Sequence, residues 1–204
     1  MTEEEAATFS RCVSAGGVAL FPSDTVYGLA TEPDSEEGVG RLYALKGRPP
    51  DRPAAVMFFD LELALAALAE LGPRTREAVQ RLLPGPLTLL LPNPARRYPL
   101  ACGPEPEQLG LRVPALNGAL APLAATRRPV LQSSANLSGG ADARRLDEVD
   151  ESIRRGVDLQ LDGGELPGRA STVVDLTRYE VDGAYRILRL GAVSASAVKT
   201  RLLR

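Results

Sequence analysis

Five polar segments of this chain place hydroxyl, amide and cationic side chains in patterns that could bind a phosphorylated ligand. They are residues 22–29 (PSDTVYGL), 46–53 (KGRPPDRP), 84–88 (PGPLT), 111–114 (LRVP) and 133–140 (SSANLSGG). Arginine offers phosphate oxygens a planar fork of donors, and lysine offers a compact charge. Because the chain contains 0 histidines, Ser-His-Asp and Cys-His catalysis are excluded, and any chemistry must use carboxylates, hydroxyls, cations or a bound metal.

The basic segment 46–53 carries Lys46, Arg48 and Arg52 on a loop that is stiffened by prolines. A stiff backbone lowers the ordering cost of binding, which suits a phosphate site. The loop could instead be a solvated basic surface, and segments 22–29 and 133–140 could be hydrogen-bonded turns. The sequence has neither the Walker GxxxxGK[ST] motif nor a GxGxxG fingerprint, so a nucleotide would have to be bound by other means.

Arg112 lies inside an apolar stretch that we expect to be a strand. A buried arginine needs a partner, so this side chain should either meet an internal acid or point at an anionic ligand. Further along, Ser171 begins one expected strand and Arg189 ends another, which adds a hydroxyl and a cation at strand ends.

The elements that must position these residues alternate along the chain. We expect strands over residues 18–21, 54–59, 88–91, 109–113, 130–132, 157–161, 172–176 and 185–188. We expect helices over residues 3–15, 35–45, 61–71, 74–83, 116–124, 146–155 and 194–203, a polar turn over 23–28 and a proline-rich loop over 96–108. The pattern predicts an α/β fold with a twisted, open, mixed sheet flanked by helices, and residues 1–204 as one domain. The five polar segments fall at strand ends, where α/β proteins place their ligand sites.

Composition excludes several classes of protein. Hydrophobic residues make up 44% of the chain, but no apolar run approaches the ~20 residues that a membrane helix needs. The acidic start MTEEE does not resemble a signal peptide, so we expect a cytoplasmic protein in which Cys12 and Cys102 are free thiols. The net charge of −2 and the aromatic content of 4% do not favour RNA binding as the main role.

Taken together and in order, these segments resemble the YrdC family, which includes the threonylcarbamoyl-AMP synthases. The resemblance is carried by PSDTVYGL, KGRP with Pro53, PGPLT, GLRVP, SSANLSG, STVVDL and ILRLGAV, and it extends from about Gly16 to Val193. Some members carry a second C-terminal domain, whereas this chain resembles the short, single-domain form. The resemblance implies a YrdC-like fold with a large positive cavity.

The resemblance also implies an activity. Family members convert L-threonine, bicarbonate and ATP into threonylcarbamoyl-AMP and pyrophosphate, and a separate threonylcarbamoyl transferase complex then modifies tRNA. Mg²⁺ would bridge phosphate oxygens; its protein ligands are unknown, and Asp24 is one option. By motif, Lys46 and Arg48 would be catalytic, and the ATP site would comprise Lys46, Arg48, Arg52, Thr88, Ser134, Asn136 and Arg189. The threonine site would comprise Thr25, Tyr27, Met57, Arg112 and Ser171.

Three positions depart from the family pattern. Ser23 replaces a threonine, Arg52 replaces a lysine or asparagine, and Met57 replaces a histidine that contacts threonine in some members. The sequence therefore leaves two alternatives open: a paralogue that binds nucleotide without synthase activity, and an RNA-binding module. For the synthase itself we expect at most weak tRNA binding. Threonine-dependent release of pyrophosphate would distinguish the synthase from both alternatives.

Overall fold

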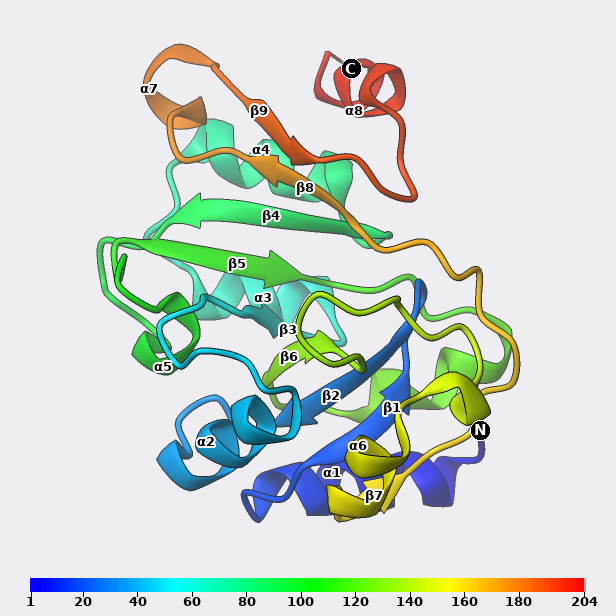
Figure 1. The fold of residues 1–204 in the computed structure, drawn as a ribbon. Coiled ribbons are helices and arrows are strands. Elements are labelled where there is room, and N and C mark those ends of the chain that lie inside the picture. The colour runs from blue at the N-terminus through cyan, green and yellow to red at the C-terminus, as the bar shows by residue number, and fades with distance from the viewer. Residues whose placement is uncertain (204) are drawn as a thin grey trace.

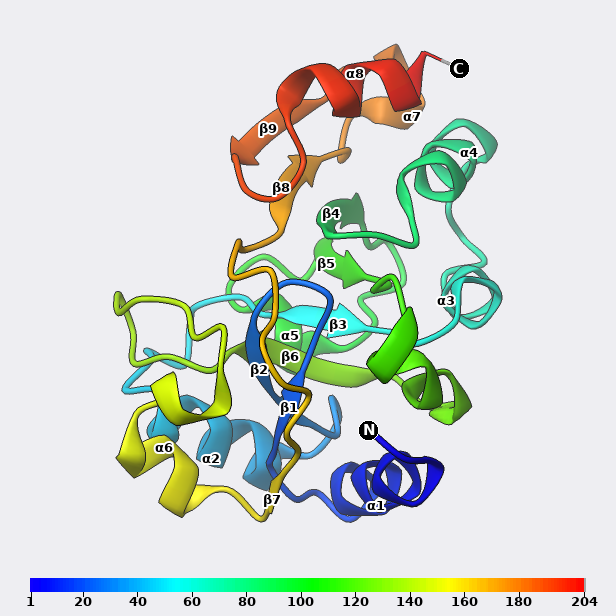
Figure 2. The same cartoon turned by 90° about the vertical axis from the view of Figure 1, so that its right-hand side faces the viewer.

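A mixed, strongly twisted sheet of nine strands organises the computed structural model, which describes residues 1–203 (Figures 1 and 2). The strands are β1 Ala19–Pro22, β2 Tyr27–Thr31, β3 Ala55–Met57, β4 Leu87–Pro92, β5 Gln108–Arg112, β6 Val130–Ser134, β7 Leu159–Gln160, β8 Thr172–Asp175 and β9 Arg186–Arg189. Their order is β7-β1-β2-β6-β3-β5-β4-β8-β9. The pairs β1–β7, β3–β5 and β4–β8 are parallel, and the others are antiparallel. The predicted fold class is confirmed.

Several helices begin at capping side chains that the sequence provides. The helices are α1 Glu3–Ser14, α2 Glu36–Leu45, α3 Leu61–Ala67, α4 Pro73–Leu82, α5 Pro99–Cys102, α6 Glu151–Gly156, α7 Tyr179–Asp182 and α8 Ala195–Leu202, with 3₁₀ turns η1 Gly118–Ala125 and η2 Leu146–Glu148. Thr2 and Glu5 form the expected capping box at α1, and Ser35 and Ser194 accept backbone N–H groups at α2 and α8. Figure 1 shows α1 and α8 at opposite ends of the sheet.

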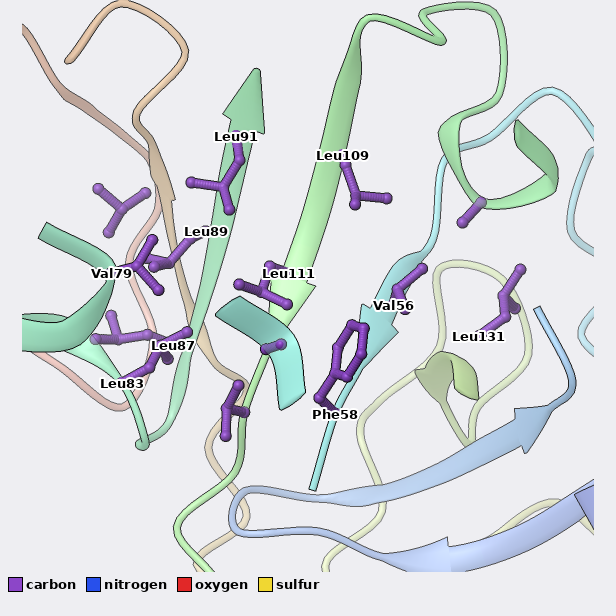
Figure 3. Packing of buried hydrophobic residues seen from close by; sticks show 14 of the residues in the cluster. Val56, Phe58, Val79, Leu83, Leu87, Leu89, Leu91, Leu109, Leu111 and Leu131 are labelled. Atoms are coloured by element: carbon purple, nitrogen blue, oxygen red, sulfur yellow. The ribbon is translucent and has the colours of Figure 1, made fainter. Parts of the chain in front are cut away.

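One face of the sheet carries the larger hydrophobic core (Figure 3). Leu131, Val56, Leu111, Leu89 and Val174 are register partners across consecutive strands, so their side chains lie on the same face. Helices α2, α3 and α4 cover this face. Strand β4 alternates buried and half-buried residues, because its odd-numbered leucines enter this core while Thr88 and Leu90 face the other way.

The opposite face is covered only in part. Around β1 and β2, a second core packs Phe9 of α1 against Phe21, with ring centroids 5.0 Å apart, and adds Phe59 and Leu123 of η1. Over β4, β5 and β8 the same face bears polar side chains and borders a cavity. The fold therefore leaves one half of a sheet face open for a ligand.

Several predicted elements differ from the structure: the helix expected over residues 116–124 is the 3₁₀ helix η1, the helix expected over residues 61–71 ends at Ala67, and α7 was not predicted. The turn expected over residues 23–28 ends early, because Tyr27 begins β2 and pairs with Pro22 in a hairpin. The helix expected over residues 146–155 is divided, because Asp150 accepts the N–H of Ser152 and starts α6 anew after η2. The loop expected over residues 96–108 contains the short helix α5. Within residues 1–203, no helix has the length and apolar character that crossing a membrane requires.

Candidate active site

A cavity of about 320 Å³ opens on the uncovered half of the sheet face. A register row across four neighbouring strands, made by Gln132, Ala55, Gly110 and Leu90, forms its floor. Its polar walls are made by Arg48, Thr88, Arg112, Ser134, Asp142, Ser171 and Arg189. The volume falls in the range of small-molecule sites, and three arginines against one lining carboxylate favour an anionic ligand.

Arg112 lies where β5 ends and is fixed by a buried ion pair. Its Nη2 lies 2.9 Å from Oδ1 of Asp24, and both side chains are 5% exposed. Nη2 also donates to Oγ1 of Thr25 at 3.1 Å, and Nη1 donates to Oε1 of Gln132 at 3.3 Å. The second oxygen of Asp24 accepts the N–H of Ala115 at 3.0 Å. The expected internal acid is therefore present, and both Asp24 oxygens are engaged, which leaves this residue poorly placed as a metal ligand.

The cavity holds positive charges close together. Burial lowers the pKa of Arg112, Asp24 opposes that shift, and the charge of Arg189 lowers the pKa further. Like charges that destabilise one another are stabilised by an anion between them. The electrostatics of this half of the site therefore suit a carboxylate or a phosphate.

Lys46 follows α2 and connects two of the polar segments. Its buried Nζ donates to the carbonyl oxygens of Ser134 and Asn136 and, at 3.1 Å, to Oδ1 of Asn136. Its own carbonyl accepts the N–H of Ser138 at 2.8 Å. Burial lowers the pKa of Lys46 to about 8, the charge of Arg48 adds to the shift, and Asp142 opposes it. Lys46 therefore holds the SSAN loop in place and lies behind the cavity wall.

Arg48 lines the cavity and rests on an aromatic residue of α2. Its Nη2 donates to the carbonyl of Pro53 at 2.6 Å, and its Cζ lies 5.8 Å from the ring centroid of Tyr43. The hydroxyl of Tyr43 donates to the carbonyl of Arg52 at 2.8 Å. Among the described residues, the buried Nε of Arg48 has no partner. The Arg52 side chain is exposed and does not line the cavity.

The far wall of the cavity joins β4, β8 and β9. Oγ1 of Thr88 lies 2.8 Å from Oγ of Ser171. Nη2 of Arg189 donates to the carbonyl of Ser171 at 2.9 Å and to its hydroxyl at 3.2 Å. Three residues predicted from separate motifs thus form one connected group.

The remaining predicted residues lie behind this lining. Tyr27 is fully buried, and its hydroxyl contacts Asp162 and Gly164 at 2.9 Å each, while burial raises its pKa to about 12. Met57 is the register partner of Arg112, but its side chain is fully buried in the core around Phe9 and Phe21. The structure therefore gives no geometric support for direct threonine contacts by Tyr27 or Met57.

Two polar lining residues outside the five polar segments were missed by the sequence reasoning. Gln132 carried a usable signal, since it is a polar residue inside the apolar stretch that precedes SSAN. Asp142 carried none, because a single carboxylate after a glycine-rich turn is typical of any surface loop.

Comparisons with known proteins identify the family of the chain. A model of the Sua5/YciO/YrdC family, described as telomere recombination, matches residues 11–191. The chain belongs to the Sua5/YciO/YrdC family. The predicted family resemblance is therefore confirmed.

Named members of the family show how far the similarity extends. A threonylcarbamoyl-AMP synthase of Pyrococcus abyssi is 33% identical over 165 residues, which are 80% of this chain and 48% of that protein. One from Xanthomonas euvesicatoria is 33% identical over 150 residues, which are 72% of this chain and 80% of that protein. The structure of P. abyssi Sua5 complexed with L-threonine matches with a TM-score of 0.84 at 28% identity, over 98% of this chain and 58% of that one. This chain thus spans about half the length of the Pyrococcus relative.

Proposed function

We propose that this chain is a threonylcarbamoyl-AMP synthase, which makes threonylcarbamoyl-adenylate and pyrophosphate from L-threonine, bicarbonate and ATP. The observation that carries the proposal is the cavity in which Arg48, Arg112 and Arg189 converge with the hydroxyls of Thr88 and Ser171. Phosphoryl and adenylyl transfer need alignment and charge stabilisation more than covalent chemistry from the protein. A site without histidine can supply both.

The proposed roles follow the two ends of the cavity. At one end, Arg48 would contact the ATP phosphates, with Lys46 and Asn136 holding the loop that presents Ser134. Arg52 is exposed beside this end and would reach phosphate only by moving its side chain.

At the other end, Arg112 would bind the amino acid or its carbamate, while Thr25 supports Arg112 from behind. The hydroxyl of Ser171 accepts a hydrogen bond from Arg189, which would contact phosphate. Thr88 completes the wall through its contact with Ser171. Tyr27 and Met57 would act only by shaping the sheet beneath the threonine.

The proposed reaction starts with a carbamate formed from threonine and bicarbonate. A carbamate oxygen attacks the α-phosphorus of ATP, the bond to the β-phosphate oxygen breaks, and pyrophosphate leaves in line. Arginines at both ends of the cavity would hold the two substrates in register and offset the charge on the phosphates.

Mg²⁺ would accompany ATP. Among residues 1–203 there is no group of three or more His, Cys, Asp or Glu side chains that could hold a metal ion, so the phosphates themselves would supply most ligands. Asp142 is the carboxylate on the cavity wall that is able to add one more. When bound, the ion would neutralise phosphate charge.

The product must pass to a second enzyme. Threonylcarbamoyl-AMP carries an activated acyl group, and we propose that it passes to a threonylcarbamoyl transferase complex that modifies tRNA, with weak tRNA binding by this chain. We propose that this reaction takes place in the cytoplasm and that residues 1–204 form a single catalytic domain. Cys12 and Cys102 are free thiols, which is compatible with a reducing compartment.

Pyrophosphate release in the presence of ATP, bicarbonate and L-threonine tests the proposal. Arg48→Ala should lower turnover at least about tenfold, since a loss of 1.4 kcal/mol in the transition state is a factor of ten. The Arg155→Ala variant, which removes an exposed arginine paired with Glu151, is the matched control and should keep full activity. Full activity of Arg48→Ala would contradict the site assignment.

A further inference from the structure

Gln132 presents a buried amide to the cavity floor. It lies on β6, is 4% exposed, and lines the cavity between Arg112 and Ser134. Its Oε1 accepts from Nη1 of Arg112 at 3.3 Å. Because an arginine can only donate, this contact fixes which end of the amide faces Arg112 and turns the NH₂ group away from it.

The NH₂ group of Gln132 has no acceptor among the described residues, and it is not one of the fully buried atoms without a partner, so it stays accessible to a ligand or to water. Space for it comes from β2, where a Cβ on Gly28 would come within 2.8 Å of Nε2. A donor that has no acceptor in the protein, on a residue that lines a ligand cavity, is available to an acceptor on the ligand.

We propose that Nε2 of Gln132 donates a hydrogen bond to a carboxylate-type oxygen of the substrate, beside Arg112. On the neighbouring wall, Asp24 balances the charge of Arg112, and both Asp24 oxygens already accept hydrogen bonds. This wall therefore offers donors, and not acceptors, to a ligand. A carboxylate oxygen is a strong acceptor for such a group. The inference rests on the proposed function. Two substrates of that reaction carry such an oxygen: L-threonine carries it in its carboxylate, and bicarbonate carries it before and after it becomes the carbamate.

Gln132→Glu tests the contact. The replacement keeps the side-chain volume and the oxygen that faces Arg112, but it changes the donor Nε2 into a negatively charged acceptor. Because the added charge beside Arg112 would by itself weaken the binding of every anionic ligand, only a loss that spares ATP counts as a lost contact. A residue that contacts a carboxylate should lose affinity at least about tenfold, as expected when a hydrogen bond to a charged group is lost.

The readouts are the KM values for L-threonine, bicarbonate and ATP, together with binding of labelled L-threonine without turnover. We expect at least a tenfold increase for L-threonine or for bicarbonate, with the KM for ATP within about twofold of the wild type. An increase in the threonine constants assigns the contact to the amino-acid carboxylate, whereas an increase for bicarbonate alone assigns it to the carbamate. Gln80→Glu, an exposed position of α4, is the matched control.

Unchanged KM values for both L-threonine and bicarbonate in Gln132→Glu would overturn the inference. If the melting temperature of this variant falls, Gln132→Met, which removes the donor without adding charge, replaces it in the same assay. Absence of turnover in the wild type would contradict the proposed function instead. In that case, the binding of labelled L-threonine to the wild type and to the variant decides about Gln132. A wild type that binds no L-threonine would overturn both the inference and the proposed function.

Discussion

The buried ion pair between Asp24 and Arg112 makes Asp24→Ala a strongly destabilising change. The two charged atoms lie 2.9 Å apart and each side chain is 5% exposed. Removing one partner of such a pair leaves an uncompensated buried charge, which typically costs about 3–5 kcal/mol. For a chain of 204 residues, each kcal/mol lowers the melting temperature by about 2–4 °C, so we expect a fall of roughly 6–20 °C.

Urea unfolding of single and double variants measures this effect. Asp24→Ala and Arg112→Met should each be costly, and the double variant should lose less than the sum of the two by about 0.5–3 kcal/mol. Glu151→Ala is the matched control, because it removes an acid from the exposed Arg155 pair and should change the free energy of unfolding by less than about 1 kcal/mol. A loss in Asp24→Ala as small as that of Glu151→Ala would refute the reasoning, since the charge left on Arg112 would then not be buried.

The remaining predictions concern Lys46 and Tyr43. Burial lowers the pKa of Lys46 from 10.5 to about 8, so the unfolded chain binds more protons between these values and the free energy of unfolding should rise with pH there. Loss of the Lys46 proton at higher pH weakens its hydrogen bonds to the SSAN loop that presents Ser134, so kcat/KM for ATP should fall above pH 8; Lys46→Arg should move that fall to higher pH, and a profile without a fall would contradict the role of Lys46 in holding this loop. Tyr43→Phe, which removes only the hydrogen bond to Arg52, should cost about 0.5–1.5 kcal/mol of stability. Tyr43→Leu also removes the ring beneath Arg48 and should raise the KM for ATP by about two- to thirtyfold, whereas equal KM values in the two variants would exclude a role for the ring.

Local patterns in the sequence were sufficient for the fold class and for several parts of the site. Alternating apolar runs and capped helices predicted a mixed α/β sheet, which the structure confirms. The rule that a buried arginine needs a partner predicted an acid or an anion at Arg112, and Asp24 is that acid. The motifs around Thr88, Ser171 and Arg189 were correctly predicted to supply polar groups at strand ends, and these three side chains meet.

The rest depended on strand register, which the sequence did not provide. Met57 is next to Arg112, yet packing of Phe9 and Phe21 decides that its side chain is core. Gln132 faces the cavity only because β6 pairs with β2 and β3, from distant parts of the chain. Lys46 was predicted as a phosphate ligand from its charge and from the family motif, whereas its position is set by the carbonyl groups of the SSAN loop.

The most direct test of the account is to incubate the purified chain with ATP, bicarbonate and L-threonine, and to follow pyrophosphate and threonylcarbamoyl-AMP together. We expect both products in equal amounts, and neither when L-threonine is omitted. ATP that binds without release of pyrophosphate would contradict the synthase and would favour a nucleotide-binding paralogue. Tight, salt-sensitive tRNA binding without either product would instead favour an RNA-binding module.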